Sequence, residues 1–315
     1  MSDMSIKGRP HPASVVGTTF AWVAAALVAT VCFFIIGFLV YQGSGAINWT
    51  FLTTDPQASL MAEQAGGIRV PFVGTAILIL GSILVAFPLA IGAAVYLAEY
   101  MADDSWFTRT VRLGLEVLAS VPSVVFGVFG LSVFTFSIFQ GLSAQGAQGA
   151  DTAFGRSFIV ASIVMGIHIL PFIIKVAEEA IRSVPKSLRQ GALALGMTKW
   201  RTIRRVVLPS ASPGIVTAVV LGMGLAAGDT AIVWLTLGGS INMAVDNWWN
   251  PSQWVEVLRG TGATLTTYVY FNSPAGEGNA PGMAFGAALV LIVLVLAFNL
   301  IAVYVGRRSA NAGRR

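Results

Sequence analysis

The sequence predicts an all-α membrane protein with six transmembrane helices, and two observations lead to this prediction. Hydrophobic residues make up 56% of the 315-residue chain and charged residues only 10%, whereas a soluble protein carries about 25% charged residues. The apolar residues are also gathered into six stretches of about 20 residues, the length that a helix needs to cross a bilayer. A mean hydropathy of +0.77 excludes a disordered chain and argues against a soluble domain.

The six expected spans are defined by the ends of the apolar stretches. In chain order they are 19–41, 70–97, 111–139, 157–177, 215–237 and 283–305. Pro88, Pro122 and Pro171 fall inside three of them, which is tolerated in membrane helices when neighbours satisfy the freed carbonyls. The first stretch is longer than a signal-peptide core and is expected to stay as an anchor.

The distribution of positive charge predicts the orientation of the spans. With the N-terminus inside, 16 of the 19 Lys and Arg residues face the cytoplasm, and only Arg69, Arg156 and Arg259 face outward. Cytoplasmic loops carry such an excess, so both termini are expected in the cytoplasm. The expected parts are a cytoplasmic tail 1–18, a first transmembrane helix 19–41, an extracytoplasmic loop 42–69, a five-helix core 70–308 and a cytoplasmic basic tail 309–315.

Composition also excludes several kinds of chemistry. The net charge of +5 is accounted for by the basic loops, so no nucleic-acid partner is expected, while membrane lipid is. Cys32 is the single cysteine and His11 and His168 are far apart in the sequence, which argues against a disulfide or a metal site. A phosphate-binding loop needs a Gly-Lys pair, and the sequence contains none. The chain is therefore not expected to be an enzyme or to bind ATP itself.

The loop 178–213 carries the most information about function. Ser187 and Gln190 have the spacing of a capping box at the start of a helix. Leu188, Ala192 and Leu195 then follow at intervals that put them on one face of that helix. Such a face is able to rest on the membrane surface or to bind another protein.

Signals for a turn and a second short helix follow in the same loop. Gly196 is suited to a left-handed residue that ends the first helix. Thr198 is a candidate cap for the second helix, and Pro209 and Pro213 are expected to separate it from the fifth span. The prediction is two short helices joined by a glycine hinge and lying across the cytoplasmic mouth.

The spacing in this loop resembles the EAA loop of permease subunits of ATP-binding-cassette (ABC) importers. The matching pattern is Gln190-Gly191-Ala192, three residues, Gly196, nine residues, then 206–209, Val-Val-Leu-Pro. It departs from the family pattern at Gln190 for Glu, at Gly191 for Ala and at Val206 for Ile. The resemblance implies that the loop docks into a groove of an ATPase subunit and transmits its closure. The residues expected to make this coupling loop are Ser187, Gln190, Gly191, Ala192, Gly196, Leu208 and Pro209.

Longer stretches are similar to one branch of these importers, the phosphate-specific transport (Pst) permeases. They are residues 66–100, 118–130 and 170–209, and the segments 178–180 and 268–272 are most like the A-type subunit, PstA. The resemblance implies a type I importer (MetI-like) permease fold and inorganic phosphate as the substrate. It also implies three kinds of partner: a dimer of ABC ATPase subunits that binds ATP and Mg, a second permease subunit that is PstC-like, and an extracytoplasmic phosphate-binding protein.

Three ionisable residues fall at or near membrane depth, where a charge usually faces a cavity or a partner. Glu116 is expected to pair locally with Arg112 or to reach the interface, and Lys175 is also near an interface. Asp229 lies well inside the fifth span. His168 is expected to be a packing residue.

Asp229 stands where Pst permeases have the Glu of an Arg-x-x-Gly-Glu-Thr motif, and Leu225 stands in place of its Arg. The family's carboxylate–cation pair therefore cannot form within this segment. We expect Asp229 to pair with Lys175 or with a cation of the partner permease. Lys175, Asp229 and Thr230 are thus the candidate residues of the translocation path or gate.

Other readings of the sequence predict different features. An importer for another oxyanion, such as sulfate or molybdate, would share the coupling loop. An ion-coupled secondary transporter usually contains internal repeats, and no repeat is found here. A membrane anchor or sensor would have no need of an EAA-like loop.

The predicted orientation is tested by cysteine labelling in a variant that lacks Cys32. A membrane-impermeant thiol reagent added to intact cells is expected to label Asn279→Cys, in the last outer loop, and to spare Ala310→Cys, in the C-terminal tail. Labelling of Ala310→Cys from outside would contradict the orientation. Labelling of both positions after membrane disruption is the control for reactivity.

Overall fold

The computed structural model describes residues 12–56, 66–101, 105–143, 155–240, 250–274, 276, 278 and 280–312. Parts of both expected terminal tails, residues 1–11 and 313–315, lie outside the described residues. Within the described part, the secondary structure is helical and the only β-interactions are two isolated bridges. The all-α prediction is confirmed.

The helices of the first half of the chain are α1 (Pro12–Gly43), η1 (Ser44–Ala46), α2 (Trp49–Thr53), α3 (Arg69–Val95), η3 (Tyr96–Tyr100), α4 (Trp106–Ser120), α5 (Ser123–Phe134) and η4 (Ser137–Leu142). Those of the second half are α6 (Phe158–Arg182), α7 (Lys186–Ala194), α8 (Lys199–Thr202), η5 (Ile203–Val207), α9 (Leu208–Gly228), α10 (Ala231–Leu237), η6 (Pro251–Gln253), α11 (Trp254–Arg259), α12 (Leu265–Asn272) and α13 (Pro281–Ala312). The segments η3 and η5 are single turns of π-helix.

Among the described residues, five helical segments are long and apolar enough to cross a membrane. They are 17–46, 69–100, 158–182, 199–228 and 281–304, and they correspond to five of the six expected spans. The remaining expected span, 111–139, is instead the pair α4 and α5, bent by 97°. The bend falls at Val121, whose backbone is extended (φ −71°, ψ 129°) because the following Pro122 disfavours a helical conformation there.

The expected fifth span, 215–237, is also wrong as a single helix. The helix α9 ends at Gly228, and Asp229 has an extended backbone (ψ 122°). A separate helix, α10, then begins at Ala231 and ends at Leu237, and the following Gly238 has a left-handed conformation (φ 94°). Glycine and aspartate both favour such interruptions, and the aspartate side chain can satisfy the freed backbone N–H groups.

The core of the molecule is built around α6. In its most apolar stretch of 18 residues, 56% of the residues are buried inside the protein. The corresponding share is 22–33% for the spans that contain α3, α9 and α13. Its fully buried side chains include Phe158, Met165, Ile169, Ile173 and Ile181. The helices α3, α9, α10, α5 and α4 all pack on α6.

Small residues allow α3 and α6 to approach closely. A Cβ atom on Gly81 of α3 would lie 2.3 Å from the Ser162 hydroxyl oxygen of α6. Membrane helices commonly use such residues at their interfaces, because packing rather than water exclusion holds them together.

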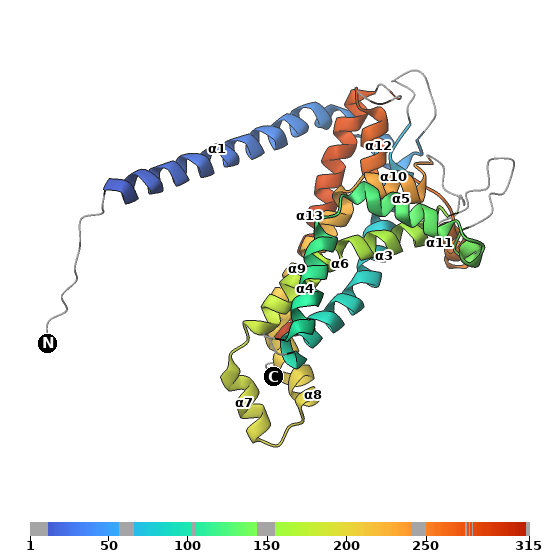
Figure 1. The fold of residues 1–315 in the computed structure, drawn as a ribbon. Coiled ribbons are helices and arrows are strands. Elements are labelled where there is room, and N and C mark those ends of the chain that lie inside the picture. Colours follow the sequence, from blue (N-terminus) through green and yellow to red (C-terminus); the bar gives the residue numbers. More distant parts are fainter. Residues whose placement is uncertain are drawn as a thin grey trace.

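The helix α1 stands largely outside this core. Phe38, near its C-terminal end, packs edge-on against Phe285 of α13 at 5.5 Å between ring centroids. No residue of its most apolar 18-residue stretch is buried. In Figure 1 the rest of α1 extends away from the other helices.

The bundle has two distinct ends, visible in Figure 1. The helices α7 and α8 lie at one end together with the C-terminal end of α13, and α10, α11 and α12 lie toward the other. We call these the α7 end and the α12 end. Loop 178–213 and the C-terminal end of α13, which were expected on one side of the membrane, both lie at the α7 end.

Candidate functional site

The helix α7 begins earlier than the sequence predicted. It starts at Lys186, with Pro185 (φ −56°, ψ 136°) as the residue before it and no side chain capping it. Ser187 therefore lies inside the helix, and the predicted capping box between Ser187 and Gln190 is wrong. The fixed φ of Pro185 already sets the chain direction needed at a helix start.

The end of α7 is formed as predicted. Gly196 is left-handed (φ +78°), its N–H donates to the carbonyl of Leu193 at 2.9 Å, and the Met197 N–H donates to Ala192 at 3.2 Å. These two bonds make a Schellman motif, which ends a helix and satisfies its last carbonyls. Thr198 caps α8 by accepting a bond from the Arg201 N–H at 3.4 Å. The glycine hinge and the threonine cap are confirmed.

The second short helix is not separate from the fifth span. After α8 the chain passes through the π-turn η5 directly into α9, and residues 199–228 form one span candidate. Pro209 occupies the first turn of α9, and Pro213 lies inside it. Neither proline separates the loop from the span, because proline is tolerated in the first turn of a helix and, within membrane bundles, in the interior.

The outer surface of α7 and α8 is open and apolar. Ala192 is the only buried residue of α7, while Gln190 and Gly191 are exposed. Four large apolar side chains, which we call the α7 surface, are exposed by 45–86%: Leu188, Leu193, Leu195 and Trp200. Such a patch on a segment outside the bundle marks a site for binding another protein or a membrane surface.

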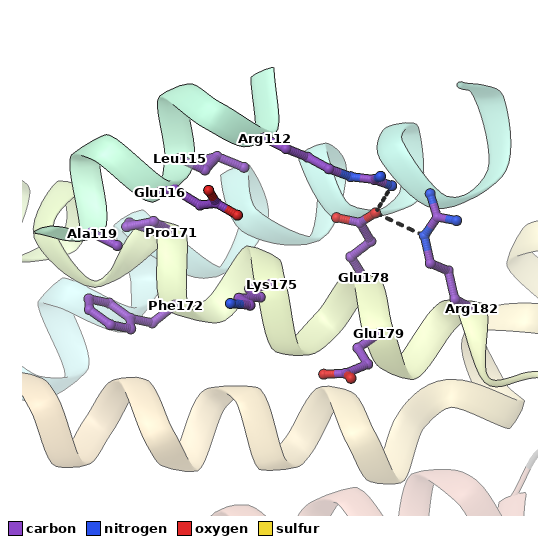
Figure 2. Close-up of a pocket in the computed structure, with 10 residues that line it drawn as sticks. All are labelled: Arg112, Leu115, Glu116, Ala119, Pro171, Phe172, Lys175, Glu178, Glu179 and Arg182. Atoms are coloured by element: carbon purple, nitrogen blue, oxygen red, sulfur yellow. Dashed lines mark hydrogen bonds and ion pairs between the residues drawn. The ribbon is translucent and has the colours of Figure 1, made fainter. Parts of the chain in front are cut away.

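A cleft of about 450 Å³ lies between α4 and the C-terminal half of α6 (Figure 2). Its lining includes charged residues of both signs and a few apolar ones: Arg112, Leu115, Glu116, Ala119, Pro171, Phe172, Lys175, Glu178, Glu179 and Arg182. Lys175 is exposed into this cleft. The structure thus places Lys175 among carboxylates of α4 and α6.

Glu178 is the centre of an ion network in this cleft. One of its oxygens accepts from Arg112 of α4 at 2.7 Å and from Arg182 of α6 at 2.8 Å. Arg112, which was expected to pair locally with Glu116, thus bonds across helices to Glu178. Bonds to two arginines explain how a carboxylate can be almost fully buried here.

Asp229 has two contacts at the break between α9 and α10. Its Oδ1 accepts from the Ile232 N–H at 2.8 Å, which satisfies a free backbone donor at the start of α10. Its Oδ2 lies 4.0 Å from Nε2 of His168 on α6, and both side chains are largely buried, with 11% and 13% exposed. The structure therefore places His168, rather than Lys175, beside Asp229.

His168 combines this contact with the packing role that was expected. Its ring contacts Phe126 of α5 edge-on at 5.0 Å and Phe172 at 6.3 Å between centroids. The signal that was missed in the sequence is Gly228-Asp229-Thr230 ahead of an apolar stretch, which is also a helix-start pattern. Nothing in the spacing indicated that residue 168 would meet residue 229.

Thr230 lies next to Asp229 and lines a different cavity, of about 350 Å³. Three further hydroxyl groups line it, those of Thr266, Tyr270 and Ser273. Within the described part of the chain, no three His, Cys, Asp or Glu side chains lie together as metal ligands would. The polar groups brought together are therefore suited to hydrogen bonding and ion pairing.

Together these features define an integral membrane protein whose helical bundle carries a projecting α7–α8 hairpin with an exposed apolar surface. The chain belongs to the family described as binding-protein-dependent transport system inner membrane component, which it matches over residues 86–311. It is therefore a permease subunit of an ABC importer, an inner-membrane protein with several spans whose ATPase is a separate subunit.

Individual relatives and a solved structure agree with this assignment. The probable ABC transporter permease protein YqgI of Bacillus subtilis is 31% identical over 285 residues, covering 90% of this chain and 91% of that protein. The phosphate transport system permease protein PstA 1 of Mycobacterium tuberculosis H37Rv is 30% identical, with 95% and 89% covered. A crystal structure of a bacterial alginate ABC transporter has the same fold, with a TM-score of 0.60 at 18% identity and 94% and 97% coverage.

The contact between Asp229 and His168 is tested by a double-mutant cycle on thermal unfolding of the purified transporter. Asp229→Asn and His168→Gln are expected to be non-additive by about 0.5 kcal/mol or more, because residues in contact share their interaction energy. Asp229→Asn and Lys175→Gln are expected to be additive. Additive effects for Asp229 and His168 would contradict the pairing.

Proposed function

We propose that this chain is the permease subunit through which inorganic phosphate crosses the cytoplasmic membrane by alternating access. The energy comes from hydrolysis of ATP, which a dimer of ATPase subunits binds together with Mg. A second, PstC-like permease and an extracytoplasmic phosphate-binding protein complete the transporter. Both termini and the α7 end face the cytoplasm in this proposal.

The observation that carries the proposal is the α7 surface. Leu193, on the projecting helix α7, and Leu195, directly after its last residue, are exposed by 49% and 86%. A helix with such an apolar face is suited to a groove on another protein. The proposed coupling residues lie on α7, at the turn after it and at the start of α9: Ser187, Gln190, Gly191, Ala192, Gly196, Leu208 and Pro209. Closure of the ATPase dimer would move this hairpin and thereby the spans.

Phosphate is favoured as the substrate by the relatives. Proteins described as phosphate transport system permeases, of both the PstA and the PstC kind, are 29–32% identical to this chain. A second candidate, another oxyanion such as sulfate or molybdate, is favoured by one observation. Leu225 stands where the Pst motif has an arginine, so the positive group expected to meet a phosphate is missing from α9.

The proposed gate lies where α9 gives way to α10. Asp229 and Thr230 occupy this break, and Lys175 lies on α6 nearer the α7 end. Asp229 would hold the break closed through His168 or through a cation of the partner permease. With such a cation as the partner, separation of the pair would expose positive charge to the anion. Lys175 would then meet the anion further along its path.

Uptake measurements test the substrate. Cells that lack this chain are expected to lose high-affinity uptake of radiolabelled phosphate and to recover it when the gene is restored. Excess unlabelled sulfate or molybdate is expected to leave phosphate uptake unchanged. Loss of sulfate or molybdate uptake with normal phosphate uptake would establish the second candidate instead.

The hinge at Gly196 gives a test of the coupling role that does not depend on the substrate. Gly196→Val is expected to lower transport by about tenfold or more while the complex still assembles, because a β-branched residue is strained at φ +78°. Gly196→Asn is the matched control, since asparagine tolerates a left-handed conformation, and it is expected to keep most transport. Normal transport by Gly196→Val would contradict a role for the hinge.

A further inference from the structure

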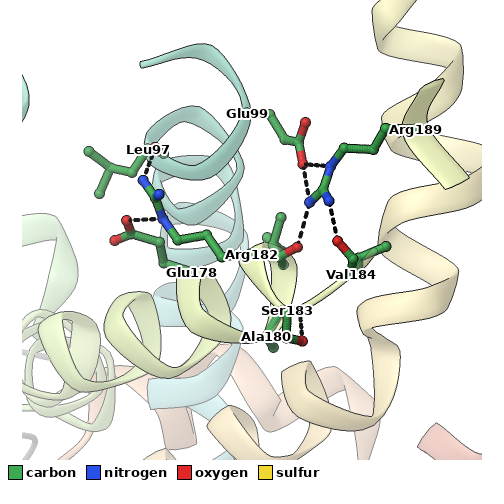
Figure 3. Close-up of polar contacts among 9 residues, drawn as sticks. Leu97, Glu99, Glu178, Ala180, Arg182, Ser183, Val184 and Arg189 are labelled. Carbon is green, nitrogen blue, oxygen red and sulfur yellow. Dashed lines mark hydrogen bonds and ion pairs between the residues drawn. The ribbon is translucent and has the colours of Figure 1, made fainter. Parts of the chain in front are cut away.

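The π-turn η3 (Tyr96–Tyr100), at the end of α3, receives side chains from three other elements. Arg189 of α7 donates to the Glu99 carboxylate, Arg182 of α6 donates to the Leu97 carbonyl at 2.9 Å, and Lys199 of α8 lies 4.5 Å from the centre of the Tyr100 ring. Figure 3 shows the first two of these contacts side by side. A five-residue turn is therefore the meeting point of the hairpin and the spans.

Arg189 is the strongest of these links. Its Nε donates to Glu99 Oε1 at 2.9 Å, its Nη2 lies 2.8 Å from the same oxygen and donates to the Ile181 carbonyl at 2.7 Å, and its Nη1 donates to the Val184 carbonyl. One guanidinium thus joins α7 to the ends of both α3 and α6. The side chains of Arg189 and Glu99 are exposed by only 19% and 9%, so this ion pair is shielded from water and salt.

The rest of α7 is held loosely. Ala192 is its only buried residue, and a Cβ atom added at Gly191 would meet nothing within 4 Å. With so little apolar packing beneath α7, the bonds of Arg189 decide how α7 is oriented on the bundle.

The same turn is also connected to the bent pair α4 and α5. Arg182, which holds the Leu97 carbonyl, also bonds to Glu178, and Glu178 bonds to Arg112 of α4. Figure 2 shows Glu178 between these two arginines. A displacement of η3 would therefore act on α3 directly and on α4 through two further ion pairs.

We propose that the Arg189–Glu99 ion pair is the joint that transfers movement of α7 to the membrane spans, with Glu99 and Arg189 as positioning residues for coupled transport. This inference rests on the proposed docking of α7 to an ATPase subunit. When the joint is intact, the hairpin and the end of α3 move as one body. When it is broken, α7 still binds its partner, but its movement is absorbed in the loop.

The test uses the complete transporter in proteoliposomes and measures two quantities for each variant, phosphate transported per ATP hydrolysed and the amount of ATPase subunit that co-purifies. Glu99→Gln and Arg189→Gln are each expected to lower transport per ATP by about fivefold or more, a typical size for coupling between sites, with unchanged co-purification. The double variant is expected to be no worse than the more severe single variant, because both changes break one link. Arg109→Ala, which removes an exposed arginine of α4, is the control for loss of positive charge and is expected to behave as the unaltered chain.

Three results would overturn the joint: unchanged transport per ATP in Glu99→Gln, additive effects in the double variant, or loss of the ATPase subunit from Glu99→Gln complexes. If Arg189→Gln fails to accumulate, Glu99→Gln decides alone, since it leaves the carbonyl contacts of Arg189 in place. Failure of the docking proposal itself has a different signature. Leu195→Cys in an otherwise unaltered chain would then form no crosslink to the ATPase subunit.

Discussion

Every part of this structure depends on one constraint: within an apolar layer, backbone N–H and C=O groups must be satisfied by the protein itself. Continuous helices meet the constraint over most of the chain. Where a helix stops inside the bundle, a side chain takes over, as Asp229 does for the Ile232 N–H. At the end of α6, Arg189 does the same for the carbonyls of Ile181 and Val184. The functionally interesting residues are therefore found at the helix ends, where backbone groups need outside partners.

The central helix α6 connects the two regions to which we assign function. His168 lies on it beside the break at Asp229, and Glu178 and Arg182 lie on it beside the hairpin. Between them, Ile169, Ile173 and Ile174 are fully buried. A closely packed interior resists local deformation, so a shift of one end of α6 reaches the other end as movement of the whole helix.

Much of the fold could be predicted from composition and apolar stretches, because five of the six spans depend only on length and hydropathy. The hinge at Gly196 and the cap at Thr198 could also be predicted, since both are set by local backbone chemistry. Pro122 was expected to be tolerated within one span and Asp229 was placed inside a continuous fifth span, although the proline and the Gly-Asp pair at the bend and the break were visible in the sequence. The contacts of Asp229 with His168 and of Arg189 with Glu99 could not be predicted, because they join residues 61 and 90 positions apart.

Arg182, at the end of α6, and Arg189, on α7, also matter for how the protein is inserted into the membrane. With the α7 end in the cytoplasm, as proposed, Arg182 and Arg189 first act during insertion as positive charges that keep the loop from crossing the membrane. In the folded chain the same two side chains are bound to carboxylates and carbonyls. Insertion requires only a positive charge, which lysine also provides, whereas the folded contacts require the several donors of a planar guanidinium. Membrane insertion therefore permits either lysine or arginine at these two positions, and the contacts of the folded structure require arginine.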